Sequence, residues 1–300
     1  MWRRVRRSVR IGAATSGVAL VAATVAFGTP PTRILTAASP PPWQGDTACT
    51  PVRNVDSVLV RGRITAFGEI HGTNELPEFV GNVLCHAWKR RLPVTLGVEL
   101  ASESSASLDA FVHSSADSAR ARATLLADSI WHGSWLDGRT SLAMAQLLER
   151  ARVVAKAGGN VRVVAFSRPS QPNRDSTMAA ELARVLARDP SRVVIILTGN
   201  IHSRVVRGVA FDSTFRPMTL RLKELVRPRR VVGLNASYQS GTAWICLSDG
   251  SPCGAHPIKG HETIPPRGIE LGPIDKGYDG VYSVGPIVAS PPAVAGKALP

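Results

Sequence analysis

The sequence predicts an α/β fold with a mainly parallel central sheet, flanked by helices on both faces, and a polar crevice at the carboxyl ends of the strands. Three short apolar runs support this prediction, because each has the length and composition of a buried strand: residues 64–68, 94–98 and 193–197. Helical segments separate them, and alternating strands and helices are typical of a parallel sheet. In such sheets, ligands bind beyond the carboxyl ends of the strands.

The remaining elements follow from the spacing of apolar residues and from the residues that interrupt it. Strands are expected at residues 64–68, 93–99, 161–166, 192–197 and 231–235, with an edge strand at 242–246. Helices are expected at residues 74–91, 104–113, 117–131, 141–157, 174–188 and 218–226. Two consecutive glycines, Gly158 and Gly159, end the fourth of these helices.

Four segments divide the chain of 300 residues, which is long enough for one large domain. Residues 1–28 begin with an arginine-rich stretch and continue with an uncharged run, which resembles a secretory signal peptide or, alternatively, an N-terminal membrane anchor. Residues 29–45 are rich in Pro, Ala, Ser and Thr and indicate a flexible linker. A single α/β domain is expected over residues 46–285, and a loosely ordered tail over residues 286–300. We therefore expect an exported protein, periplasmic or extracellular, whose only contact with a membrane would be an uncleaved first segment.

Much of the positive charge belongs to the first segment. Residues 1–28 contain five arginines and no acidic residue, so removing them lowers the net charge from +14 to +9. The other arginines are scattered and lack the aromatic interleaving of nucleic-acid-binding proteins. We therefore expect no nucleic-acid partner, and a small-molecule or peptide-like ligand instead.

The four cysteines of an exported chain are most simply two disulfides. Three pairings are open from the sequence. The short, turn-like loop between Cys246 and Cys253 favours their pairing, and Cys49 with Cys85 would then tie the start of the domain to its first helix. A metal site is the weaker alternative, because the spacing is not that of paired zinc knuckles.

Three of the apolar runs lead directly into acidic or histidine side chains. The first continues as GEIHGTNE (residues 68–75), which places Glu69 and His71 on one face of an extended chain. The second ends at Glu99, and the strand at 193–197 is followed by His202. Because all four residues lie just past strand ends, the sequence predicts that they share one crevice.

These motifs resemble those of the erythromycin esterase and ChaN-like superfamily, which is grouped with the haem-binding uptake and Tiki proteins. The resemblance covers residues 62–250 and rests on four motifs: GEIHGTNE at 68–75, GVEL at 97–100, the helix start at 174–179 and TGNIHS at 198–203. It implies that the two glutamates and two histidines line an active site. The esterases usually have two residues between the Glu and His of the first motif; this chain has one, which is closer to the ChaN-like branch.

The resemblance and the residue types together predict a hydrolase that cleaves an ester, lactone or peptide-like bond. His71 is expected to be the general base, held by Glu69 or Glu99, and His202 to stabilise or protonate the leaving group. Arg174 is expected either to bind a substrate carboxylate or to pair with a catalytic glutamate.

An alternative function is haem or metal uptake without catalysis. Glu69, His71, Glu99 and His202 would also be a sound ligand set for Zn²⁺, Mn²⁺ or Fe²⁺. The ChaN-like resemblance implies haem as the other candidate cofactor. A purely structural network of the same side chains is the third interpretation, so the cofactor (a divalent metal, haem or none) stays open.

Weaker candidates lie elsewhere in the chain. Tyr238 and Tyr282 are candidate haem ligands only because tyrosine is scarce. The segment from Asp137 to Arg139, which follows His132, would form a pocket wall opposite the crevice or, alternatively, a capped turn before the helix that starts at Ser141.

Overall fold

The computed structural model describes residues 48–133, 137–169, 171–247 and 253–294. The expected export segment, residues 1–28, and the expected linker, residues 29–45, lie outside the described residues. All described residues belong to one compact unit. Within them, no helix is both long and apolar enough to cross a membrane.

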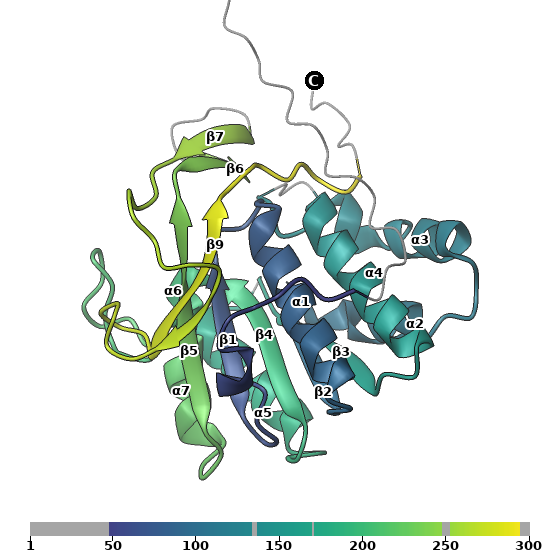
Figure 1. The fold of residues 1–300 in the computed structure, drawn as a ribbon, viewed down its shortest axis with the longest axis horizontal. Coiled ribbons are helices and arrows are strands. Elements are labelled where there is room, and N and C mark those ends of the chain that lie inside the picture. The colour runs from purple at the N-terminus through teal and green to yellow at the C-terminus, as the bar shows by residue number, and fades with distance from the viewer. Residues whose placement is uncertain (1–47, 134–136, 170, 248–252, 295–300) are drawn as a thin grey trace, which may run out of the picture. The chain divides into compact units, whose positions relative to one another are not determined.

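A seven-stranded sheet forms the centre of the fold, in the order β3-β2-β4-β1-β5-β9-β8 (Figure 1). Neighbouring strands are parallel, except that β8 is antiparallel to β9. The strands of this sheet are β1 (Ile64–Glu69), β2 (Val94–Ala101), β3 (Val161–Ser167), β4 (Val193–Gly199), β5 (Val231–Gln239), β8 (Gly268–Leu271) and β9 (Gly280–Pro286). The expected α/β fold with a mainly parallel sheet is confirmed.

Helices cover both faces of this sheet. One face is packed by α1 (Glu75–Lys89), α2 (Ser105–Val112), α3 (Ser118–Leu126) and α4 (Leu142–Lys156). The other face is packed by α5 (Arg174–Leu186) and α7 (Met218–Leu225), which contact the short α6 (Asn200–Ser203). Three single-turn 3₁₀ helices lie at Val55–Ser57, Ser102–Ser104 and Ser129–His132.

The central strands are apolar on both sides because each face of the sheet carries a core. Within β1, Phe67 packs in the core with α1 and α4, whereas Ala66 packs in the core with α5 and α7. Ile195 and Ile196 divide in the same way within β4. A strand buried on both faces has no polar alternation, which is why these runs are visible in the sequence as continuous apolar segments.

The edge strand expected at residues 242–246 is present, but it lies outside the central sheet. Residues 241–245 form β6 (Gly241–Ile245), but it pairs antiparallel with β7 (Gly254–Ile258) in a separate two-stranded sheet. The backbone N–H of Trp244 donates to the Gly72 carbonyl at 2.8 Å, and that of Thr242 donates to the Ile287 carbonyl at 3.0 Å. These bonds hold β6 against the loop after β1 instead of the edge of the central sheet.

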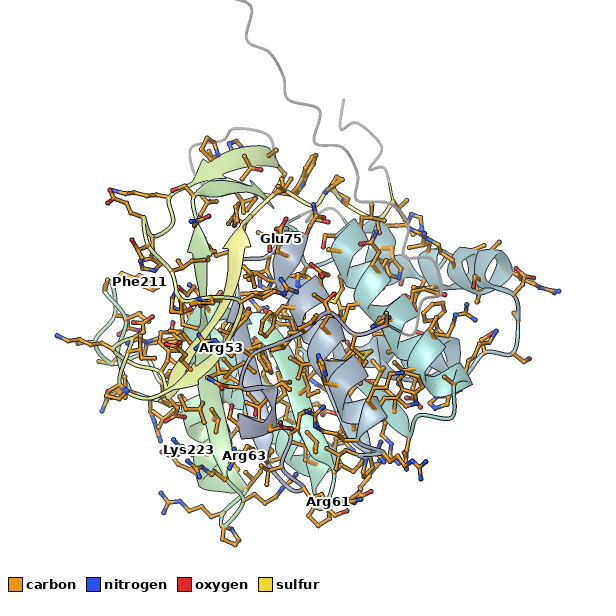
Figure 2. The ribbon with its side chains drawn as sticks, viewed as in Figure 1. Arg53, Arg61, Arg63, Glu75, Phe211 and Lys223 are labelled. Carbon is orange, nitrogen blue, oxygen red and sulfur yellow. A yellow bond between two sulfur atoms is a disulfide. The ribbon has the colours of Figure 1, made fainter. Side chains whose placement is uncertain are left out.

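The loose tail expected from residue 286 is wrong for residues 287–294, which we call the C-terminal strap. Its residues Ile287, Ala289 and Ser290 are buried. In Figure 1 the strap is the yellow segment that runs from β9 past the ends of α1 and α4. Figure 2 shows Glu75 at the start of α1, where its carboxylate accepts the Val288 N–H at 2.9 Å. A Pro/Ala-rich composition hid this order, because the strap is held through backbone groups; residues 295–300 lie outside the described part.

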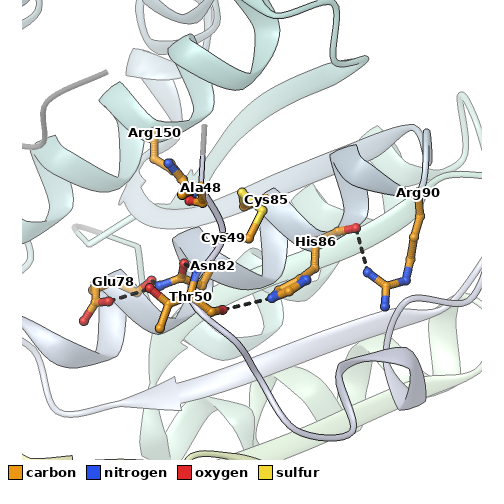
Figure 3. The surroundings of a disulfide bond; sticks show 9 residues. All are labelled: Ala48, Cys49, Thr50, Glu78, Asn82, Cys85, His86, Arg90 and Arg150. Carbon is orange, nitrogen blue, oxygen red and sulfur yellow. Dashed lines mark hydrogen bonds between the residues drawn. A yellow bond between two sulfur atoms is a disulfide. The ribbon is translucent and has the colours of Figure 1, made fainter. Parts of the chain in front are cut away.

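Both disulfides favoured by the sequence are present, Cys49–Cys85 and Cys246–Cys253. The first ties the start of the domain to α1 (Figure 3). Thr50 strengthens the same junction, since its N–H donates to Asn82 Oδ1 at 2.8 Å. Two disulfides are consistent with an exported protein.

The outer edge of β3 is covered by side chains of α2. Ser105 Oγ both accepts the Ala165 N–H and donates to the Ala165 carbonyl, each at 2.8 Å. Asp109 accepts the Val163 N–H at 2.8 Å. The Val163 N–H and both backbone groups of Ala165 therefore have partners on the outer side of this terminal strand.

Candidate active site

The four predicted side chains lie at the carboxyl ends of three adjacent strands, β2, β4 and β1. Glu69 is the last residue of β1, and Glu99 lies near the end of β2. His202 is on α6, which follows β4 without a break. His71 lies in the loop that leads from β1 into α1. Residues far apart in the sequence are thus brought together at one end of the sheet.

The Glu99 carboxylate is the centre of this cluster. Its Oε2 accepts the Thr198 hydroxyl at 2.6 Å and the Gly199 N–H at 2.7 Å. Its Oε1 faces two imidazoles, with His71 Nε2 at 3.7 Å and His202 Nε2 at 4.0 Å. The first oxygen anchors the side chain to β4, and the second is left for the site.

Two arginines face the same oxygen. Arg174 donates to Glu99 Oε1 and, at 3.3 Å, to Ser167 Oγ. Arg139 Nη1 lies 3.7 Å from Glu99 Oε1, while its Nε donates to Asp137 at 3.0 Å. Of the two roles expected for Arg174, the pairing with a glutamate is the one present in this structure.

Charges within the cluster set the protonation of its centre. Burial alone would raise the pKa of the Glu99 carboxyl, but the charge and hydrogen bond of His71 lead the interactions that hold that pKa well below its ordinary value. Burial alone would lower the pKa of His71, but the Glu99 and Glu69 carboxylates outweigh it and raise the pKa to about 10. At neutral pH, His71 and Glu99 therefore form an ion pair. The expected role of His71 as general base does not fit this charge state, because an imidazolium has no free lone pair.

Glu69 fixes the ring of His71 from the other side. Its Oε1 lies 2.9 Å from His71 Nδ1. Burial raises the pKa of the Glu69 carboxyl, and the bond with His71 only partly offsets this rise. Its Oε2 is buried without a hydrogen-bond partner. Glu69 thus orients the imidazole so that Nε2 points at Glu99.

Asp175 is a site residue that the sequence interpretation missed. Its Oδ1 lies 2.8 Å from His202 Nδ1 and also accepts the Met218 N–H at 2.6 Å. In the neutral ring, a carboxylate at Nδ1 favours the tautomer with its proton on that nitrogen, so that the lone pair lies on Nε2, which faces Glu99. Asp175 directly follows Arg174 in the sequence, which is the signal that could have drawn attention to it.

Arg139 was singled out only as part of a wall or a capped turn, and it reaches the site. Gly138 makes this possible: its φ is +88°, and a Cβ there would fall 2.4 Å from the Gly72 nitrogen. The turn therefore packs directly against the backbone that follows His71. In this structure Arg139 therefore lies beside Glu99, at the wall of the site.

The cationic side chains of the cluster are more exposed to solvent than its two glutamates. The side chains of Glu69 and Glu99 are 2% and 1% exposed, whereas those of His71, Arg139 and Arg174 are 20%, 19% and 29% exposed. A ligand would therefore meet an imidazolium and two guanidinium groups first, with the carboxylates behind them.

Comparisons with known proteins identify the fold. No protein-family description and no curated protein matches the chain. Among solved structures, an erythromycin esterase variant in its open conformation matches with a TM-score of 0.55 at 12% identity, over 78% of this chain and 89% of that one. The chain has an erythromycin esterase-like fold.

Two further structures share this erythromycin esterase-like fold. A succinoglycan biosynthesis protein matches with a TM-score of 0.54 at 7% identity, over 83% of this chain and 94% of that one. A protein from Bacillus cereus matches with a TM-score of 0.52 at 10% identity, over 83% of this chain and 95% of that one. At such identities the likeness concerns the fold alone.

The four candidate metal ligands of this chain do not fit a divalent cation in this structure. Among the described residues, no group of three or more His, Cys, Asp or Glu side chains is arranged to hold a metal ion. The positive charges of His71, Arg139 and Arg174 surround Glu99 Oε1 and would oppose the binding of a metal cation there.

Tyr282, one of the two candidate haem ligands, makes a hydrogen bond within the core. Tyr282 is buried, and its hydroxyl donates to the Gly68 carbonyl at 3.0 Å. Burial raises the pKa of Tyr282 well above its ordinary value, which disfavours the phenolate that would bind iron. In this structure the Tyr282 hydroxyl is therefore buried and bonded to the backbone of β1.

Proposed function

We propose that this protein is an exported hydrolase of the erythromycin esterase-like superfamily that cleaves an ester, lactone or peptide-like bond with a Glu/His site. The observation that carries the proposal is that two imidazole Nε2 atoms, of His71 and His202, face one oxygen of Glu99 at 3.7 and 4.0 Å. One ring is held protonated and the other has a carboxylate on its far nitrogen. A proton donor and a proton acceptor thus face the same point.

His202 is the general base in this proposal. Asp175 holds its Nδ1–H, so Nε2 is free to accept a proton from a water molecule that attacks the carbonyl carbon. Asp175 also stabilises the imidazolium that results. This orienting role explains why the buried Asp175 carboxylate contacts His202 at Nδ1, away from Glu99.

His71 is the general acid. Its Nε2–H is directed toward the site, and it can protonate the leaving alkoxide or amine when the tetrahedral intermediate collapses. The proton accepted by His202 then returns to His71, since both Nε2 atoms face the same Glu99 oxygen. Water has added its hydroxyl to the acyl group and its proton to the leaving group, so the reaction balances.

The two arginines stabilise negative charge. Arg139 and Arg174 are partly exposed beside the imidazoles, and their positive charge favours the oxyanion of the tetrahedral intermediate. Glu99 keeps these cations in place and limits their mutual repulsion. Cationic donors fixed before the substrate arrives lower the barrier because they need not reorganise.

A screen of chromogenic esters and lactones tests the proposal, with four variants beside the wild type: His71→Ala, His202→Ala, Glu99→Gln and His261→Ala. The first three should lose turnover by about 100-fold or more, because each removes a proton-transfer group or its anchor. His261→Ala is the matched control, since His261 is exposed. Circular dichroism and thermal melting check that all variants fold. Equal turnover in His202→Ala and His261→Ala, or no turnover of any substrate by the wild type, would refute the assignment.

The same purified protein tests the competing function of haem or metal uptake. Elemental analysis and an absorption spectrum should show neither a stoichiometric metal nor a Soret band, because cations already surround Glu99. A metal or haem that is present in the wild type and lost in His71→Ala would replace the hydrolase by the uptake function.

Export is supported by the two disulfides, which persist in an oxidising compartment. N-terminal sequencing of the protein from a periplasmic or secreted fraction tests it. A new N-terminus near residue 28 would indicate a cleaved signal peptide. The intact N-terminus in a membrane fraction would indicate the anchor, and a cytoplasmic protein with reduced cysteines would contradict export.

A further inference from the structure

The C-terminal strap contacts the loop that carries His71. The Ser290 N–H donates to the Gly72 carbonyl at 2.7 Å, one residue after His71. The Asn74 N–H donates to the Val288 carbonyl at 3.0 Å. A short antiparallel bridge also joins Thr73 to the strap. The strap thus holds the chain that leaves the His71 position.

On its other side the strap contacts the loop that carries Arg139. The Ala293 N–H donates to the Thr140 carbonyl at 2.9 Å, one residue after Arg139. The Leu142 N–H donates to the Pro291 carbonyl at 2.8 Å. The strap therefore lies between the two loops and is bonded to both.

Ser290 by itself joins the His71 loop to the start of α4, the helix that follows the Arg139 loop. Its N–H binds Gly72, and its Oγ accepts the Ala143 N–H at 2.9 Å. Ala143 lies in the first turn of α4, where backbone N–H groups lack partners within the helix. Ser290 thus caps α4 from a distant part of the chain, and it is fully buried.

His71 and Arg139 depend on this junction because they act at the same point. His71 Nε2 and Arg139 Nη1 each lie 3.7 Å from Glu99 Oε1, although they come from different loops. We propose that Ser290 is a positioning residue that fixes Arg139 relative to His71: its N–H binds the His71 loop, and its Oγ binds the first turn of α4, into which the Arg139 loop leads. This inference rests on the hydrolase function proposed above.

A double-mutant cycle on turnover tests the inference with Ser290→Ala, Arg139→Ala and the double variant. Ser290→Ala should lower kcat about tenfold with little change in KM, since a displaced guanidinium weakens stabilisation of the transition state. In the Arg139→Ala background the same substitution should change kcat by less than about twofold, because residues that act together are not additive. A general loss of stability would instead lower kcat equally in both backgrounds, and that result would overturn the proposal.

Ser283→Ala is the matched control for burial. Ser283 is a buried serine of β9, in register with Ser237 of β5 and Gly268 of β8. Its substitution should leave kcat unchanged. A fall in kcat equal to that of Ser290→Ala would show that any buried serine has this effect and would overturn the positioning role.

A second readout needs no turnover and separates this inference from the proposed function. The NMR titration of the His71 imidazole should move to higher pH in Ser290→Ala, because Arg139 then competes less for Glu99. The shift should be absent when Arg139 is already alanine. If the wild type hydrolyses nothing but this shift appears, the hydrolase proposal fails and the link from Ser290 to Arg139 stands. If the titration is unchanged by Ser290→Ala, the link fails whatever the turnover.

Discussion

Gly199 of β4 donates its backbone N–H to the Glu99 carboxylate of β2 at 2.7 Å. Its lack of a side chain matters as much as this bond. A Cβ on Gly199 would lie 3.1 Å from His71 Nε2 and 3.4 Å from His202 Cδ2. The two imidazoles therefore meet in space that only glycine leaves open.

Gly199→Ala should lower kcat/KM about tenfold while the protein stays folded. The new methyl group is closer to His71 Nε2 than ordinary contacts allow, so the imidazole must shift by a few tenths of an ångström. Misplaced catalytic groups lose rate steeply. Steady-state kinetics measure the effect, and Gly133→Ala is the control because no atom lies within 4 Å of the added Cβ. Equal kinetics for the two variants would contradict the packing argument.

Asp175→Asn should lower kcat by about 100-fold or more, because the neutral amide no longer stabilises the His202 imidazolium. Folding should be largely kept, since the amide oxygen can still accept the Met218 N–H. Asp109→Asn is a suitable comparison, because Asp109 also accepts a backbone N–H but lies at the outer edge of β3. Kinetics combined with urea unfolding separate the two effects. A similar rate for both variants would remove Asp175 from the proposed mechanism.

The free energy of unfolding should fall as the pH rises from about 6.5 to about 10. The folded protein raises the pKa of His71 from 6.5 to about 10, so the folded state holds this proton more tightly than the unfolded state. The stabilisation is complete below pH 6.5 and is lost as the pH rises through the folded pKa, at about 1.4 kcal/mol for each pKa unit. Urea unfolding at several pH values measures it. In His71→Gln this part of the pH dependence should disappear, and an unchanged slope would assign it to other groups.

The two disulfides should differ in their contribution to stability. Cys49–Cys85 closes a loop with a sequence separation of 36 residues, and Cys246–Cys253 one of 7 residues. Loop-closure entropy predicts losses of about 4 and about 2 kcal/mol, respectively, when each pair is replaced by serine. Urea unfolding of the two double variants compares them. A larger loss for the shorter loop would mean that native contacts, and not loop length, decide the difference.

Much of the fold and the centre of the site could be predicted from the sequence because both depend on local patterns. The apolar runs of β1, β2 and β4 are continuous, so their ends were visible, and Glu69, Glu99 and His202 stand at those ends. The glycine in GEIHGT marked the turn after β1. Residues at the carboxyl ends of neighbouring parallel strands meet without any knowledge of side-chain contacts.

The other parts depend on contacts between distant residues. Asp175 is a site residue because it meets His202, and Arg139 because its turn packs against Gly72; neither contact leaves a local pattern. The strap is held by backbone groups such as the Ser290 N–H, which composition does not reveal. The protonation of His71 follows from burial among carboxylates, so its role could not be read from the motif alone.

The side chains of α2 that cover the outer edge of β3 affect whether strands of other molecules can pair with this sheet. A terminal strand with unpaired N–H and carbonyl groups is a template to which a strand of another molecule can add. Ser105 and Asp109 occupy three of those groups in the middle of β3, so a strand that pairs there would have to displace α2 first. The middle of β3 therefore cannot pair with a strand of another molecule while α2 is in place. This protects the native protein from aggregation by strand addition at that edge.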